Sequence, residues 1–188
     1  MEQLTTCLSC ESTQFLSIQK TKAMMHPSKE IFNFDQCQNC GLVFLNPRVF
    51  EKNLGEFYTD YYLPYRGDEA WGKYANFVSG SQKTVDKKRV ATVSRYAQNI
   101  PKATVLDVGC GKPTFLKMLF EQYKCRAVGT DFSNSGWKNA PSEYQNLELL
   151  EGDIHELKDL PKADIITMWH YLEHDYQPAK TLQKLIYI

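Results

Sequence analysis

Four cysteines near the N-terminus have the spacing of a metal site. Cys7 and Cys10 form one Cys-x-x-Cys pair, Cys37 and Cys40 form another, and 26 residues separate the inner two cysteines. Each pair can form a tight turn that directs two thiolates at one ion, and two such turns make a tetrahedral site of four sulfur atoms. Such a site leaves no coordination position open, so we predict structural zinc. Iron in the same site and a redox-active dithiol are the alternatives.

A second group suited to chemistry follows a predicted buried strand. The run 105–112 reads Val-Leu-Asp-Val-Gly-Cys-Gly-Lys, and apolar residues with helical spacing follow it up to about Tyr123. A strand that ends at two glycines and passes into a helix can bring backbone N–H groups and a helix N-terminus up to a ligand. We therefore expect Gly109 and Gly111 to shape a ligand-binding turn.

Acidic residues follow two further predicted strands. Asp131 follows the strand 126–130 and lies 20 residues after Gly111, and Asp153 follows the strand 146–150. A carboxylate at the tip of the second strand of a βαβ unit can accept hydrogen bonds from both hydroxyl groups of a ribose. Either acid can instead cap a helix. The glycine turn favours ribose binding for Asp131, whereas spacing alone does not decide the role of Asp153.

A fourth predicted strand, 163–169, leads into a segment with two histidines and a glutamate. Ligands of open parallel sheets bind outside the carboxyl ends of the strands, so this segment should face the reacting group. His174 can act as a general base because the ordinary pKa of imidazole lies near neutral pH. Glu173 can orient that imidazole or bind a substrate. The alternative is that the segment only packs the end of the sheet.

The elements that must position these residues indicate an α/β fold. Apolar residues recur with helical spacing between 79 and 99, at Val85, Val90, Val93 and Ala97, and predict one buried helix face. Strands and helices then alternate, which predicts a Rossmann-like, doubly wound, mostly parallel sheet. Short strands at 15–20 and 31–35 carry the cysteine turns of a small zinc ribbon. The two remaining cysteines, Cys110 and Cys125, are expected to be small core residues.

Composition limits the function classes. The chain has 188 residues with 22 basic and 22 acidic side chains, so its formal net charge gives no general attraction to nucleic acid or to an anionic membrane. Seven basic residues between positions 73 and 102 are expected to form a solvated helix face rather than a binding patch. The sequence shows neither a signal-peptide pattern nor an apolar run of membrane-spanning length, so we expect a cytoplasmic protein.

The run from Leu106 to Gly111 resembles the first motif of class I S-adenosylmethionine (SAM)-dependent methyltransferases. The run 169–174, Trp-His-x-Leu-Glu-His, is similar to a post-strand motif of small-molecule methyltransferases, and 40–48 is similar to the connector of those that carry a zinc ribbon. Thr114 replaces the third glycine of a dinucleotide-binding fingerprint, which weakens an NAD assignment. The chain departs from the methyltransferase pattern at Pro113, which has no N–H where that family has a third glycine.

The resemblance implies SAM as cofactor and methyl transfer to a small molecule such as a sugar, a quinone or a lipid-like intermediate. It also implies that Asp153 binds the adenine amino group, that Ile154 backs the ring, and that His174 and Glu173 serve catalysis. The cofactor contacts would come from Asp107, Gly109, Cys110, Gly111, Asp131, Phe132, Asp153, Ile154 and Trp169.

The expected division is a zinc ribbon at 1–46, an aromatic connector at 47–78 and an incomplete methyltransferase domain at 79–188. Tyrosines of the connector either line a lid or pack the ribbon against the main domain (Tyr58, Tyr61, Tyr62 and Tyr65). The family's last strands have no counterpart here, so we expect a truncated fold whose fourth strand is an exposed edge unless a homodimer covers it. The alternative function is a non-catalytic zinc-ribbon protein on a degenerate SAM-binding scaffold. Nucleic-acid binding is disfavoured because residues 1–50 hold four basic and four acidic side chains.

Overall fold

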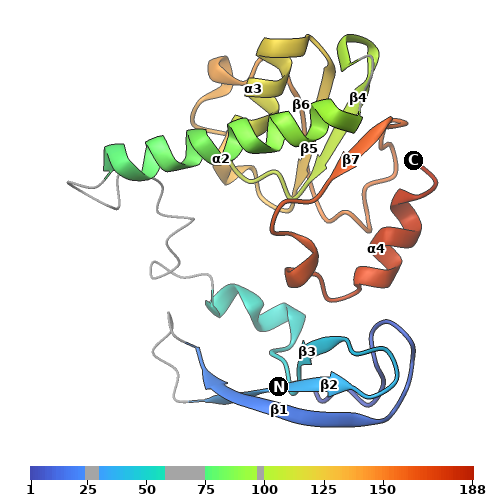
Figure 1. The fold of residues 1–188 in the computed structure, drawn as a ribbon. Helices are drawn as coiled ribbons and strands as arrows, with labels where there is room; N and C mark the ends of the chain where they lie inside the picture. The colour runs from blue at the N-terminus through green and yellow to red at the C-terminus, as the bar shows by residue number, and fades with distance from the viewer. Residues whose placement is uncertain (24–29, 58–74, 97–99) are drawn as a thin grey trace. The chain divides into compact units, whose positions relative to one another are not determined.

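The computed structural model describes residues 1–23, 30–57, 75–96 and 100–188 and divides into two compact units (Figure 1). The first unit is Met1–Ala75 and the second is Asn76–Ile188. The tyrosines predicted to form a lid, 58–65, lie outside the described residues. Each unit is described by itself below.

The first unit contains a three-stranded antiparallel sheet in the order β1-β2-β3, with bounds Phe15–Lys22, Ile31–Cys37 and Val43–Leu45. The two predicted ribbon strands are thereby confirmed. Buried Asn46 holds the ribbon together: its side chain accepts a hydrogen bond from the Leu4 amide at 2.8 Å and donates to Asp35 Oδ2 at 2.9 Å. A 3-10 helix, η1 (Glu51–Phe57), follows.

The second unit is built on a parallel sheet in the order β6-β5-β4-β7. Its strands are β4 (Thr104–Val108), β5 (Arg126–Asp131), β6 (Glu148–Glu151) and β7 (Ile165–Thr167). This order confirms the predicted doubly wound α/β fold. Asp107 pairs with Gly129 on one side and with Thr167 on the other, so the carboxyl ends of three strands meet at one edge of the sheet.

Helices cover both faces of this sheet (Figure 1). On one face, α2 (Ala75–Tyr96) and α3 (Thr114–Tyr123) bury apolar side chains such as Val93, Leu116 and Leu119 against β4 and β5. On the other face, Leu185 of α4 (Pro178–Leu185) packs with Leu106 and Val128. Short 3-10 helices connect these elements (η3, Ile100–Lys102; η4, Asn134–Gly136; η5, Pro141–Glu143; η6, Leu172–His174). None of the helices in the described ranges has the length and apolar character needed to cross a bilayer.

The predicted buried face of the helix at 79–99 is partly wrong. Val90 and Val93 are buried, but Val85 is 38% exposed, and Asp86 beside it is only 1% exposed. Asp86 lies four residues before Val90, so the helical repeat places it on the buried face, where hydrogen bonds satisfy its carboxylate. Ala97 lies outside the described residues.

The basic residues of α2 are mostly solvated, as predicted. Lys83, Lys87, Lys88 and Arg95 are exposed, whereas the guanidinium of Arg89 lies against the Trp169 ring, 5.2 Å from its centroid. Two strands are shorter than predicted. The segment before β6 is occupied by a turn in which the Leu147 amide donates to the Tyr144 carbonyl, and β7 pairs with β4 over only three residues.

Candidate functional site

The glycine turn between β4 and α3 has the backbone conformation that glycine favours. Gly109 has φ of 73° and Gly111 has φ of 52°, both in the left-handed region. The expectation that the amides of this turn face a ligand is wrong for three of them. The amides of Gly109 and Cys110 donate to the Thr130 carbonyl at 2.8 and 3.0 Å, and the Gly111 amide donates to Asp131 Oδ2 at 2.9 Å. The turn is therefore fixed to β5 by its own N–H groups.

Asp131 stands at the tip of β5 beside this turn. Its Oδ2 accepts the Gly111 amide, and its Oδ1 accepts the Ser133 amide at 3.1 Å. Partial burial raises the pKa of Asp131, and these backbone donors oppose the rise. Each carboxylate oxygen accepts more than one hydrogen bond, so both retain capacity for a ligand hydroxyl group. The next side chain, Phe132, is 67% exposed.

Asp107, the last residue but one of β4, is a buried acid. The Thr167 hydroxyl of β7 donates to its Oδ1 at 2.6 Å. Burial raises the pKa of Asp107 to about 7, the bond from Thr167 and the charge of Arg89 lower it, and the negative charges of Asp86 and Asp131 add to the rise. The carboxyl end of the sheet thus holds an acid that changes charge near neutral pH.

Sequence reasoning missed a second buried acid that supports the site. Asp86 of α2 accepts a hydrogen bond from the Thr114 hydroxyl at 2.7 Å, at the first residue of α3, just after the N-cap Pro113. Arg89 lies 3.5 Å from the other oxygen of Asp86. The available signal was an acid four residues before Val90, on the apolar face of the helix.

Trp169 follows β7 and packs between Phe115 of α3 and Arg89 of α2. Its ring meets that of Phe115 edge to face at 5.8 Å between centroids. The indole Nε1 is buried, and within the described ranges it has no hydrogen-bond partner. A buried donor without an acceptor is costly, so this atom marks a place that a polar ligand atom would stabilise.

Cys110 and Ile154 direct their side chains into the core. Cys110 is half-buried, and its Sγ would lie 2.8 Å from a Cβ placed on Gly129. Ile154 is 4% exposed among Leu106, Val108 and other residues of one core cluster. Both therefore support the site mainly through packing, and they offer a ligand little side-chain surface.

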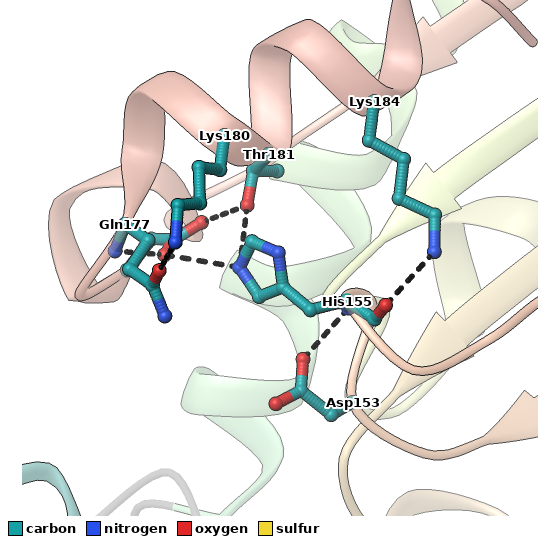
Figure 2. Close-up of polar contacts among 7 residues, drawn as sticks. Asp153, His155, Gln177, Lys180, Thr181 and Lys184 are labelled. Atoms are coloured by element: carbon teal, nitrogen blue, oxygen red, sulfur yellow. Dashed lines mark hydrogen bonds and ion pairs between the residues drawn. The ribbon is translucent and has the colours of Figure 1, made fainter.

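Asp153 makes the contacts of a cap. Its Oδ1 accepts the His155 amide at 2.8 Å (Figure 2). Its carbonyl accepts the Glu156 amide at 2.9 Å. This is the local alternative that the sequence left open. The exposed carboxylate keeps a second oxygen for other donors.

In the segment after β7, Glu173 contacts a histidine for which no role was predicted from the sequence. Glu173 Oε1 lies 3.3 Å from Nδ1 of His170, whose φ of 56° is unusual for a residue other than glycine. The backbone N–H of Glu173 and the contact with His170 lower the pKa of Glu173, and the charge of His174 contributes. Glu173 and His174 are both exposed at this edge of the sheet.

The four predicted metal ligands converge in the first unit. The sulfur atoms of Cys7, Cys10, Cys37 and Cys40 all lie within 4.8 Å of one another. Two pairs, Cys7 with Cys40 and Cys10 with Cys37, are 3.6 Å apart. A tetrahedron with zinc–sulfur bonds of about 2.3 Å has edges of about 3.8 Å, so the cluster fits zinc.

Local donors favour the thiolate form of two of these ligands. The backbone N–H of Cys40, helped by that of Asn39, lowers the pKa of Cys37 to about 6. The Asn39 side chain lowers the pKa of Cys10. The backbone N–H of Leu42 lowers the pKa of Cys40, but burial and the contacts with the other three sulfur atoms outweigh it and raise the pKa to about 11. Metal binding requires deprotonated thiols, so an ion would have to displace the proton of Cys40.

We predict about one equivalent of zinc per chain in protein purified without chelator, measured by elemental analysis. Cys10→Ser should lose the metal because three sulfur ligands no longer close the site. Cys125→Ala, in the core of the second unit, is the matched control and should retain it. Less than half an equivalent in the unmodified protein would contradict the zinc assignment.

We predict that Gly136→Ala destabilises the site more than most glycine substitutions do. An added Cβ would lie 2.1 Å from the Gly111 carbonyl oxygen and 2.5 Å from its carbon, so backbone must move. The free energy of unfolding should fall by about 2 kcal/mol or more in urea titrations. Gly80→Ala, where nothing lies within 4 Å, is the control and should be neutral or stabilising. Equal free energies of unfolding for the two variants would contradict the prediction, because the loop would then move away from the added methyl group at little cost.

We predict that Asp107→Asn changes the pH dependence of stability. The folded pKa is raised from 3.8 to about 7, so the folded state holds a proton that the unfolded state has released between these values. The contribution of Asp107 to the free energy of unfolding therefore falls as pH rises from about 4 to about 7. Between pH 5 and pH 8 the unmodified protein should lose about 2–3 kcal/mol relative to Asp107→Asn in urea titrations. Parallel stability curves for the two proteins would refute the raised pKa.

The chain was compared with known families and proteins. The family model described as a methyltransferase domain matches residues 81–187, which is more than half of the chain. Comparison with curated proteins gave no match.

Several solved methyltransferase structures are similar in part. Coclaurine N-methyltransferase bound to N-methylheliamine and S-adenosylhomocysteine (SAH) is 24% identical, with 53% of this chain and 31% of that one covered and a TM-score of 0.47. Plantazolicin methyltransferase BpumL with SAH is 18% identical, with 66% and 53% covered and a TM-score of 0.44. DesVI from Streptomyces venezuelae is 18% identical, with 59% and 50% covered and a TM-score of 0.45. The chain thus spans between about a third and half of these structures. By the family match over residues 81–187, this chain belongs to the methyltransferase domain family.

Proposed function

We propose that this chain takes part in the transfer of a methyl group from SAM to a small-molecule acceptor. The observation that carries the proposal is the convergence of the glycine turn, Asp131 and Asp107 at the carboxyl end of one parallel sheet. Open α/β sheets bind their ligands at this edge. Membership of the methyltransferase domain family supports methyl transfer as the reaction class. That the acceptor is a small molecule is our proposal.

The residues present fit this cofactor on four counts. Gly111 leaves open space, because a Cβ built there would meet nothing within 4 Å. Asp131 retains lone pairs for ribose hydroxyl groups. The buried Nε1 of Trp169 has no acceptor in the described part of the chain. Finally, Asp107 carries negative charge above its pKa of about 7, which suits a cationic sulfonium.

Each side of the site would have its own role. SAM supplies an activated methyl group on a sulfonium, so the protein mainly has to align the acceptor and exclude water. Asp131 would hold the ribose, and exposed Phe132 would offer its ring to the adenine. Asp153 would contribute its remaining oxygen to the adenine amino group, while Gly109, Cys110 and Ile154 shape the wall of the site through backbone and packing.

His174 would remove a proton from the acceptor, and Glu173 would set the charge around it. Both lie on η6 and are exposed at the edge of the sheet where the strands end. Glu173, whose pKa is lowered, remains anionic near neutral pH and would stabilise a protonated imidazole nearby. Because Glu173 also contacts His170, a second imidazole lies at the same edge of the sheet as His174.

The alternative function is a zinc-ribbon binding protein on a scaffold that does not catalyse. Pro113 supports it, because this N-cap position has no N–H to donate to a ligand. In both readings we propose a ribbon at 1–46, a connector at 47–78 and a SAM-binding domain at 79–188. Binding of SAH without methyl transfer to any acceptor would favour the alternative.

The proposed reaction is tested with methyl-labelled SAM and a panel of small hydroxyl, amine and carbon-acid acceptors. With an acceptor that becomes labelled, His174→Ala should lower kcat by about a hundredfold or more at saturating SAM while the KM for SAM changes little. His174→Gln serves as the matched variant that keeps polarity without basicity, and it should be equally slow. An unchanged kcat in both variants would eliminate His174 as the base. No labelled product from folded, zinc-loaded protein would argue against catalysis.

A further inference from the structure

Tyr171 lies directly on the glycine turn. A Cβ placed on Gly109 would be 2.4 Å from Cδ2 of Tyr171 and 3.1 Å from its Cβ and Cγ. Tyr171 follows β7 and Gly109 follows β4, which are neighbours in the sheet. The absence of a side chain at Gly109 therefore serves two purposes, because it permits the left-handed backbone and it makes room for the tyrosine.

The phenol of Tyr171 lies beside a buried carboxylate and a buried hydroxyl. It lies next to the side chains of Asp175 and Thr181, and burial together with the charge of Asp175 raises the pKa of Tyr171. The side chain of Asp175 is 4% exposed and Thr181 is fully buried. A phenol in this setting stays protonated and can donate to the neighbouring carboxylate.

Thr181 lies on α4 and Asp175 lies three residues before it, and together they connect this helix to a third segment. Asp175 accepts the Gln177 amide at 2.7 Å and the Thr181 hydroxyl. Thr181 Oγ1 also lies 3.1 Å from Nε2 of His155, which is 3.8 Å from Asp175 Oδ1. The imidazole of His155 thus closes a network that joins α4 to the loop after β6.

Lys184, on the same helix, makes two further hydrogen bonds to this segment. Its Nζ donates to the carbonyl of His155 at 3.3 Å and to that of Leu157 at 2.5 Å. Figure 2 shows Thr181 and Lys184 both reaching from α4 toward the segment that contains His155. This loop also carries Asp153, so α4 is bound to a second part of the site.

From these contacts we propose that Tyr171 is a positioning residue of the cofactor site, held against Gly109 by the Asp175–Thr181–His155 network of α4. This rests on the proposed function, since the site it shapes is the SAM site. Nothing in the network needs to touch the cofactor. It acts by fixing the ring that covers one side of the glycine turn, and thereby sets the affinity for the cofactor.

A purely structural role for the network makes a different prediction. In that case, loss of the Thr181 hydroxyl would lower the free energy of unfolding and leave the affinity of folded protein for ligand unchanged. With a positioning role, affinity falls in the folded protein, and restoring the hydroxyl restores it. Thr181→Val and Thr181→Ser separate the two cases, because the first removes the hydroxyl at similar volume and the second keeps it.

The experiment is calorimetric titration of SAH into the zinc-loaded full chain and its variants, each shown to be folded by circular dichroism. Thr181→Val and Tyr171→Phe should weaken SAH binding by about fivefold or more, the change expected for loss of one buried hydrogen bond. Thr181→Ser should bind within about twofold of the unmodified protein. Leu119→Ala, on α3 and buried against the opposite face of the sheet from Tyr171, is the control for lost stability and should keep its affinity.

Unchanged affinity in both Tyr171→Phe and Thr181→Val would overturn the proposal while leaving the cofactor site intact. Equal weakening in Leu119→Ala would also overturn it, because any loss of core packing would then have the same effect. If Thr181→Val does not fold, Tyr171→Phe carries the test alone, since it keeps the ring. If the unmodified protein does not bind SAH, the proposed function fails first and this proposal fails with it.

Discussion

The hydrogen bond from the Gly111 amide to Asp131 joins the glycine turn to the end of β5, and the site depends on both segments. It ties the turn after β4 to the tip of β5, over 2.9 Å and across 20 residues of sequence. The Thr130 carbonyl adds two further bonds to the same turn, so the left-handed backbone of Gly109 and Gly111 is fixed by its neighbour strand. A turn held in this way is preorganised, which lowers the cost of ordering it when a ligand binds.

Buried acids are the second constraint, because each must be satisfied where water is excluded. Asp107 is satisfied from β7 by Thr167, and Asp86 is satisfied from α3 by Thr114. Asp175 is satisfied from α4 by Thr181. Each of these bonds crosses from one element to another, so the polar contacts that neutralise the acids also fix the helices around the edge of the sheet.

Much of the fold could be predicted from the sequence because local patterns determine it. The strand β5 and the helix α3 have the bounds expected from their apolar runs, and the four cysteines converge as their spacing indicated. These signals are local, or they depend on chemistry that few other arrangements satisfy.

The predictions that failed depend on long-range contacts. The buried face of α2 was predicted wrongly because the apolar pattern placed Val85 in the core and ignored the charged Asp86. Asp86 is buried because it bonds Thr114, which lies 28 residues further along the chain. The amides of the glycine turn were expected to face a ligand, but the register of β4 and β5 supplies acceptors for them. The contact of Tyr171 with Gly109 likewise has no sequence signal, since it arises from the packing of a loop after one strand on a turn after another.

The central claim is that Asp131 and the glycine turn form a cofactor site, and a titration of SAH into the zinc-loaded protein tests it most directly. The account predicts micromolar binding that weakens by about tenfold or more in Asp131→Ala. Asp164→Ala should bind normally, because Asp164 bonds the Thr104 amide at the opposite end of the sheet. Absence of binding by folded protein, or equal affinity of Asp131→Ala and the unmodified chain, would contradict the account.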